Sequence, residues 1–78
     1  MKIGKGALLI YLRTIVDASA SDVADALEIS LPTVSMALLR LVRSGLANRT
    51  WDPKRGVFFY SITPRGEARV NYFAARGL

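Results

Sequence analysis

Apolar residues in the first part of the chain recur at the spacing of an amphipathic helix. Leu8 and Leu12 share one broad face when successive residues are turned by about 100°, and this pattern predicts a helix over residues 5–17. Leu9 and Ile10 fall outside that face. Because an apolar surplus on a short helix indicates burial on a second side, we expect these two residues to contact something other than the first core face.

Two more helices are predicted on either side of a short link. Ser21 is a good N-cap for a helix over 22–28, and carboxylates in its first turn suit the helix dipole. Ser30 can cap a further helix over 32–44, and Gly45 is well placed as the left-handed residue that ends it.

An alternating pattern follows and predicts a β-hairpin. Residues 46–51 and 57–62 form the two strands, joined by a five-residue loop over 52–56. Pro53 fixes one backbone angle of the turn, and Gly56 permits the conformation that returns the chain.

The aromatic residues of this hairpin are expected to pack within it rather than to stack on bases. Alternation predicts Phe58, Tyr60 and Ile62 on one side of the hairpin and Phe59 near Trp51 on the other side.

The chain ends with a predicted helix that has Thr63 as N-cap and Pro64 at its first position. The full order is helix, short extended piece, helix, turn, helix, hairpin, helix. This order predicts a mainly α fold with a small β-hairpin (α+β), forming one domain over residues 1–78.

Composition excludes several classes of function. The chain has 78 residues, no cysteine and no histidine, which removes disulfides, cysteine zinc sites and every catalytic arrangement that uses histidine. We therefore expect no enzyme and no cofactor. The longest uninterrupted apolar run is much shorter than the roughly 20 residues of a membrane span, so we expect a cytoplasmic protein without a membrane partner.

Charge is unevenly distributed along this basic protein, whose net charge is +5. Residues 17–28 hold four acids and no base, whereas residues 40–76 hold eight bases and two acids. A basic patch on one side of a domain is typical of proteins that bind nucleic acids. The alternative is that these charges only keep the surface solvated.

The acidic segment is also the one candidate for a metal site. Asp22, Asp25 and Glu28 lie only loosely on one face of the predicted helix, and no histidine or further carboxylate converges on them from nearby sequence. Helix capping explains two of the three, so we expect no metal.

The stretch SDVADALEISLPTVSMALLRLVRSGL, followed by the hairpin and by ITPRGEA, resembles winged helix-turn-helix proteins, in particular MarR-like and related prokaryotic transcription regulators. The resemblance covers nearly the whole chain. It implies sequence-dependent binding of double-stranded DNA, with helix 32–44 in the major groove and a wing at 52–56 on the flanking backbone or minor groove.

Helical periodicity places Val34, Leu38 and Leu41 of helix 32–44 on its core side. The resemblance then assigns DNA contacts to the opposite arc. These residues are Pro32, Thr33, Ser35, Met36, Leu39, Arg40 and Arg43. Near the helix start, Thr33, Ser35 and Met36 become candidates for base contacts, and Arg40 and Arg43 become candidates for phosphate contacts.

The apolar members of this arc leave an alternative open. Without an arginine paired to guanine, we expect modest sequence preference or a site rich in A and T. Met36 and Leu39 could instead cover a neighbouring element or a protein partner. A winged-helix protein interaction module within a larger nucleic-acid complex is therefore the alternative function.

Lys54 and Arg55 lie at the tip of the predicted wing, where long cationic side chains can reach a phosphate or a narrow minor groove. Arg49 on the first wing strand could add a phosphate contact. The alternative is a loop that its charges keep soluble.

The first and last helices predict a homodimer. The residues assigned to its interface are Leu9, Ile10, Val70, Phe73 and Ala74, because each helix carries a second apolar stripe. Such a dimer would hold two recognition helices about one DNA turn apart. No pocket for a small-molecule effector is evident in the sequence.

Overall fold

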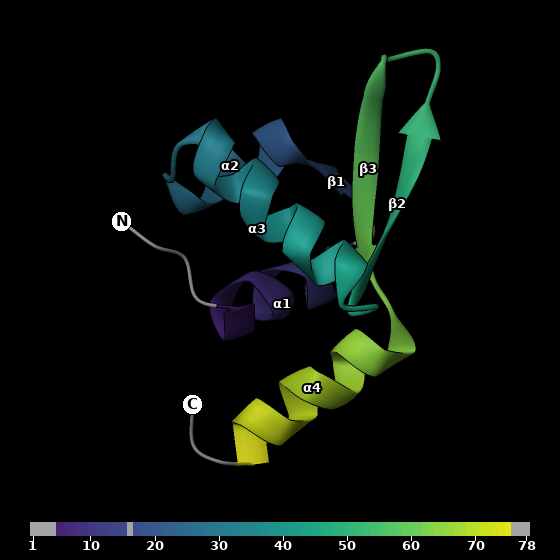
Figure 1. Cartoon of the computed structure of the whole chain (residues 1–78). Helices are drawn as coiled ribbons and strands as arrows, with labels where there is room; N and C mark the ends of the chain where they lie inside the picture. Colours follow the sequence, from purple (N-terminus) through teal and green to yellow (C-terminus); the bar gives the residue numbers. More distant parts are fainter. Residues whose placement is uncertain (1–4, 16, 76–78) are drawn as a thin grey trace.

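The computed structural model describes residues 5–15 and 17–75, with side chains described for 6–15 and 17–72. Within these residues, four helices and three strands follow in the order α1 (Lys5–Arg13), β1 (Ala18–Ser19), α2 (Ala20–Leu27), α3 (Leu31–Arg43), β2 (Ala47–Asp52), β3 (Val57–Ile62) and α4 (Pro64–Ala75). The hairpin of β2 and β3 projects away from the helices (Figure 1). The predicted α+β fold and its element order are confirmed.

Helix α1 ends at Arg13 and is therefore shorter than the predicted helix over 5–17. Thr14 caps its last turn by donating from both its backbone N–H (3.0 Å) and its hydroxyl (2.7 Å) to the Tyr11 carbonyl. The chain then becomes extended, since β1 pairs with β3 through Ala18 opposite Tyr60. A strand pairing that is distant in sequence therefore limits the length of this helix.

Helix α2 begins two residues earlier than predicted, and its N-cap is Ser19 rather than Ser21. The Asp22 backbone N–H donates to the Ser19 hydroxyl, and the Ser19 N–H donates to the Asp22 carboxylate, each at 3.2 Å. This reciprocal pair is a capping box, in which the acid at the third helical position satisfies the cap residue itself. At the other end, Glu28 adopts a left-handed φ of 55°.

Helix α3 places its core side as predicted. Val34, Leu38 and Leu41 are at most 1% exposed. The helix spans Leu31–Arg43, and Gly45 has a φ of 76°, which confirms its role after the helix end. Ser30 stands at the N-cap position without making a side-chain cap bond.

The sheet is antiparallel with strand order β1-β3-β2. Its register corrects one prediction: Trp51 stands opposite Phe58, not near Phe59, which pairs with Thr50. The Trp51 and Phe58 rings meet edge to face with centroids 5.0 Å apart. Alternation along the sequence cannot predict that Trp51 faces Phe58, because the register between β2 and β3 decides which of their residues share a face.

The turn between β2 and β3 is one residue shorter than predicted. Asp52 belongs to β2, so four residues, 53–56, connect the strands. Gly56 has a φ of 67°, as expected for the residue that returns the chain.

The core forms around α1, which packs against α3, α4 and β3. Leu8, Leu9 and Leu12 are buried almost completely, and Val70 of α4 is 2% exposed. The prediction that Leu9 and Val70 face a partner chain is therefore wrong, because the chain's own core covers them. Phe73 and Ala74 belong to α4, but their side chains lie outside the described part of the structure.

Two hydrogen bonds attach the start of α4 to the segment that follows α3. The Thr63 N–H donates to the Leu46 carbonyl (3.1 Å), and the Thr63 hydroxyl donates to the Gly45 carbonyl (2.8 Å). The same hydroxyl accepts from the Gly66 N–H at 3.0 Å, which confirms Thr63 as the N-cap. This joint sets the position of α4 relative to the hairpin.

Among the described residues, no helix is both long enough and apolar enough to cross a membrane. Within the same residues, no three acidic side chains gather in a way that could hold a metal ion.

Candidate nucleic-acid interface

The arc of α3 opposite the core stripe is the main candidate surface. Pro32, Met36, Arg40 and Arg43 are exposed, and Met36 retains 53% of its surface. The remaining predicted contacts on this helix, Thr33, Ser35 and Leu39, are half-buried. One helix face therefore presents small hydroxyls near its start, one flexible apolar side chain and two cations near its end.

The hydroxyls at the start of α3 differ in their local bonds. Thr33 accepts a hydrogen bond of 2.9 Å from the Ser30 hydroxyl, which holds its oxygen toward the preceding link. The Ser35 hydroxyl forms no hydrogen bond within the described part of the chain. Both hydroxyls can still donate to a ligand, but only that of Ser35 has no hydrogen bond within these residues that restrains its orientation.

The wing tip has a defined backbone. One Asp52 carboxylate oxygen accepts from the backbone N–H of Lys54 (2.9 Å) and of Arg55 (3.4 Å). These two hydrogen bonds stabilise the backbone conformation of the turn, and both cationic side chains remain exposed. The Arg55 guanidinium also lies 5.6 Å from the Phe59 ring centroid.

Arg49 lies on the face of the hairpin opposite to the face that carries Phe59. Its guanidinium lies over the Phe58 ring at 4.4 Å from the centroid, which is a cation–π contact. Arg49 is two residues from Trp51 on β2, so both side chains emerge on the same side of the sheet.

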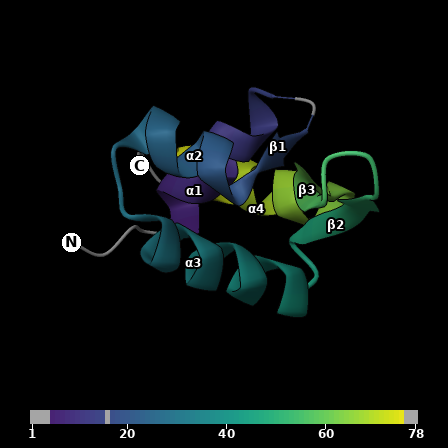
Figure 2. The same ribbon diagram turned by 90° about the horizontal axis from the view of Figure 1, so that it is seen from above.

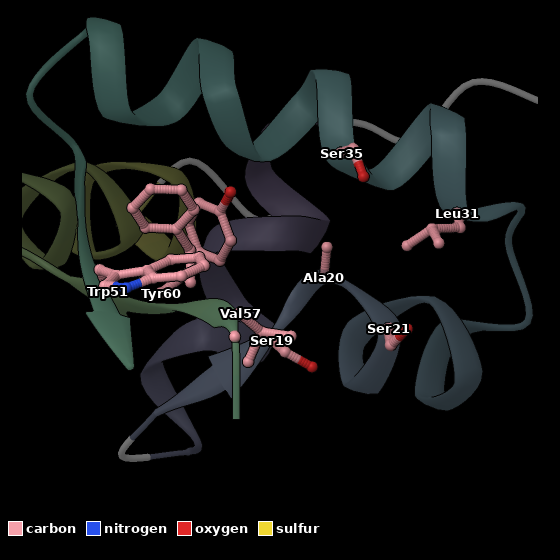
Figure 3. Close-up of a pocket in the computed structure, with 10 residues that line it drawn as sticks. Ser19, Ala20, Ser21, Leu31, Ser35, Trp51, Val57 and Tyr60 are labelled. Carbon is pink, nitrogen blue, oxygen red and sulfur yellow. The ribbon is translucent and has the colours of Figure 1, made fainter. Parts of the chain in front are cut away.

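A groove of about 280 Å³ separates the start of α3 from the wing (Figure 3). Its lining comes from β1, α2, α3 and the hairpin and includes Ser21, Leu31, Ser35, Trp51, Val57 and Tyr60. Seen from above, α3 and α2 lie on opposite sides of the molecule, and the hairpin of β2 and β3 lies at one end (Figure 2).

Sequence reasoning missed the groove. Of its lining residues, only Ser35 was among the predicted contacts, and Trp51 was assigned to internal packing. Trp51 does pack on Phe58, yet 51% of its surface remains exposed. Nothing in the linear pattern shows this, because the exposure depends on how far the hairpin stands from α3.

The cations of the candidate surface carry uncompensated charge. Within the described residues, no carboxylate forms a salt bridge with the cations of α3 and the hairpin, which are Arg40, Arg43, Arg49, Lys54 and Arg55. Asp22 and Asp52, by contrast, are occupied by backbone N–H groups. The surface can therefore attract a polyanion.

The sequence matches no protein-family model, and no curated protein matches it. Solved structures do match. A MarR-family transcription regulator, SP03579, is 31% identical with a TM-score of 0.83 over 97% of this chain and 51% of its own. Staphylococcus aureus MepR in a DNA complex is 30% identical with a TM-score of 0.81 over 91% of this chain and 60% of its own.

A third match is Bordetella bronchiseptica BpsR, whose DNA binding is regulated by 6-hydroxynicotinic acid. It is 28% identical with a TM-score of 0.84 over 96% of this chain and 54% of its own. The structural neighbours are thus MarR-family winged-helix transcription regulators, which confirms the predicted resemblance and fold. These regulators are not enzymes. The chain spans about half the length of the solved chains it matches.

Proposed function

We propose that residues 1–78 act as one winged-helix unit that binds double-stranded DNA, as a transcription regulator or as the DNA-binding part of one. Helix α3 enters the major groove, and the wing over residues 52–56 contacts the flanking backbone or the minor groove. DNA-bound neighbours such as MepR support this assignment. Such a role would place the protein in the cytoplasm with prokaryotic DNA.

The observation that carries the proposal is the exposed arc of α3 beside a cationic wing. Arg40 and Arg43 lie at the end of the helix and Lys54 and Arg55 at the wing tip, all exposed and free of salt bridges within the described residues. Guanidinium and ammonium groups at two separated places suit phosphates on both sides of a groove. Arg49, beside Phe58, adds a fifth cation to the same surface.

Contacts to bases fall to the start of α3. Ser35 can donate to or accept from several base edges, and Met36 can pack against a thymine methyl group. The Thr33 hydroxyl is less free to reorient toward a base, because it accepts a hydrogen bond from Ser30. This set predicts modest sequence preference, favouring sites rich in A and T.

The test is binding of a random-sequence duplex pool measured against salt concentration. Phosphate contacts release counterions, so affinity should fall steeply as salt rises. Replacing Arg40 and Arg43 together with alanine should weaken all duplexes about equally and lower the slope of log K against log salt by up to about 2. Arg69→Ala, an exposed arginine on α4, is the matched control.

Salt-independent affinity would contradict DNA binding through this surface. Unchanged binding by the double arginine variant, with Arg69→Ala also unchanged, would show that the contact face lies elsewhere. Selection from the same pool should show that Thr33→Ala or Ser35→Ala changes the preferred sequence more than the average affinity.

We also propose a homodimer on DNA. Of the residues predicted for its interface, Ile10 is 42% exposed on α1 and can still contact a second copy. A palindromic sequence from the selection, together with sedimentation of the free protein, tests this. Ile10→Glu should lower the dimer population because it buries a charge against an apolar surface.

An alternative function is a protein interaction module, favoured by one observation. Met36 and Leu31 are exposed apolar side chains on α3, at 53% and 46% of their surface. Absence of duplex binding at low salt, combined with a stable complex in a pull-down that Met36→Lys abolishes, would favour this alternative.

A further inference from the structure

Three large apolar side chains converge on the groove between α3 and the wing. Trp51 is 51% exposed, Leu31 is 46% exposed and Val57 is 37% exposed, and all three line it (Figure 3). Exposed apolar side chains scattered singly need no explanation, but a group around one hollow indicates a ligand or partner. Apolar side chains therefore border the groove both on α3 and on the hairpin.

Hydroxyl groups lie beside these apolar side chains, with Ser35 one helical turn after Leu31 on α3. Ser35 on α3 and Ser21 in the first turn of α2 both line the groove, and neither hydroxyl forms a hydrogen bond within the described residues. In contrast, the hydroxyl of Ser19, which also lines the groove, is used by the cap of α2. Ser35 is assigned to base edges, so the Ser21 hydroxyl is the donor available to an acceptor in the groove, and phosphate oxygens are among the strongest acceptors.

The charge beside the groove is positive. Arg49 emerges on the same side of the sheet as Trp51, held over Phe58, which itself lines the groove. No carboxylate is among the described residues that line the groove, and the nearby Asp22 carboxylate faces its own helix cap. A ligand with one apolar face and one anionic group fits these surroundings.

A DNA strand supplies both groups in one unit. The deoxyribose offers a face of C–H groups that can pack on an indole, and the phosphate next to it accepts hydrogen bonds from hydroxyls and attracts a guanidinium. Adjacent major and minor grooves are separated by a single backbone strand. If α3 occupies the first and the wing reaches the second, that strand must pass between them, which is where the groove lies.

We propose that this groove seats one sugar–phosphate unit of the strand that separates the two DNA grooves, with Trp51 packed on the deoxyribose and Ser21 donating to the phosphate. The inference rests on the proposed DNA-binding function. It adds a contact of the wing strand, outside the tip and outside the recognition arc.

The chain carries its own probe, because Trp51 is the sole tryptophan of the sequence. Acrylamide quenching of its fluorescence is measured on the wild-type protein, first alone and then with the random-sequence duplex pool at low salt. Acrylamide is neutral, so DNA does not repel it and it leaves ionic strength unchanged. In the same samples, anisotropy of a labelled duplex reports binding independently.

Loss of most acrylamide quenching when the duplex binds is the expected result. Bound duplex with Trp51 quenched as freely as before would overturn the inference and leave DNA binding intact. No anisotropy change at low salt would remove the proposed function and the inference with it. Stronger protection by single-stranded DNA than by duplex would show stacking on bases instead, and protection at high protein concentration without DNA would show a second copy in the groove. Either result overturns the proposal.

Variants separate contact from folding. Trp51→Ala should weaken duplex binding about fivefold because the apolar area packed on the deoxyribose is lost, while Trp51→Phe should retain most of the affinity. The salt slope should stay unchanged in both, because an apolar contact releases no counterion. Thr50→Ala is the matched control, since Thr50 is exposed on the opposite face of the same strand. Equal affinity of Trp51→Ala, Thr50→Ala and wild type, with circular dichroism showing folded protein, would overturn the assignment.

Discussion

Replacing Gly66 with alanine tests the joint between α4 and the hairpin. Gly66 is the third residue of α4, and its N–H donates to the Thr63 cap hydroxyl. A Cβ placed there would collide with the Leu46 carbonyl oxygen and would lie 2.7 Å from Cγ1 of Ile62. The backbone of Leu46 cannot move freely, because its carbonyl accepts the Thr63 N–H. The close approach therefore requires a residue without a side chain.

Helix propensity and overpacking have opposite effects on the stability of the Gly66→Ala variant. Alanine favours a helix over glycine by at most about 1 kcal/mol, and less in the first turn. Against this, overpacking costs about 1 to 3 kcal/mol. If the joint opens to relieve the collision, each hydrogen bond lost at Thr63 costs about 1 kcal/mol more. We expect a net loss of about 3 kcal/mol in the free energy of unfolding, which for a domain of this size lowers Tm by about 12 to 24 °C.

The measurement is urea unfolding at low temperature followed by circular dichroism, with a thermal scan as a second reading. Arg69→Ala is the control, because this exposed residue of the same helix should change stability by no more than about 0.5 kcal/mol. A Gly66→Ala midpoint equal to or above that of wild type would show that α4 is not held against Leu46 as described.

Three further predictions concern stability. Ser19→Ala should cost about 1 kcal/mol because it removes the capping box of α2, whereas Ser21→Ala should be nearly neutral; equal losses in urea unfolding would contradict the observed cap. Thr63→Val should cost about 1 to 3 kcal/mol, since its hydroxyl serves two backbone groups, and a neutral result would refute that role. Gly56→Ala should cost about 1 to 2 kcal/mol and Gly56→Asn less, because φ is 67°; identical thermal midpoints for the two variants would argue against backbone strain.

The sequence predicted features that depend on neighbours along the chain. The core stripe of α3 through Val34, Leu38 and Leu41 follows from helical periodicity, which needs no tertiary information. Thr63 before Pro64 identified the start of α4 through a local capping preference. These elements confirm that local patterns predict element type well when caps and periodicity agree.

Predictions failed where a distant contact decided the outcome. Ser21 and Ser19 are both good caps by local rules, and pairing of β1 with β3 favoured Ser19 by holding Ala18 and Ser19 extended. Leu9 appeared to be an apolar surplus only because a single helix cannot show how many elements surround it. Helices α3 and α4 and strand β3 all pack on α1, so a residue outside its first apolar face is still buried.

In the candidate surface, too, some features follow from local sequence and others only from the tertiary structure. Residue order alone identified the exposed arc of α3 and the cations of the wing, because helical phase and turn chemistry are properties of short segments. Only the tertiary structure placed Trp51 opposite Phe58 and beside the groove that Leu31 and Ser35 line from α3. Strand register and the spacing between hairpin and helix are set by contacts among residues far apart in the chain, and no local pattern encodes them.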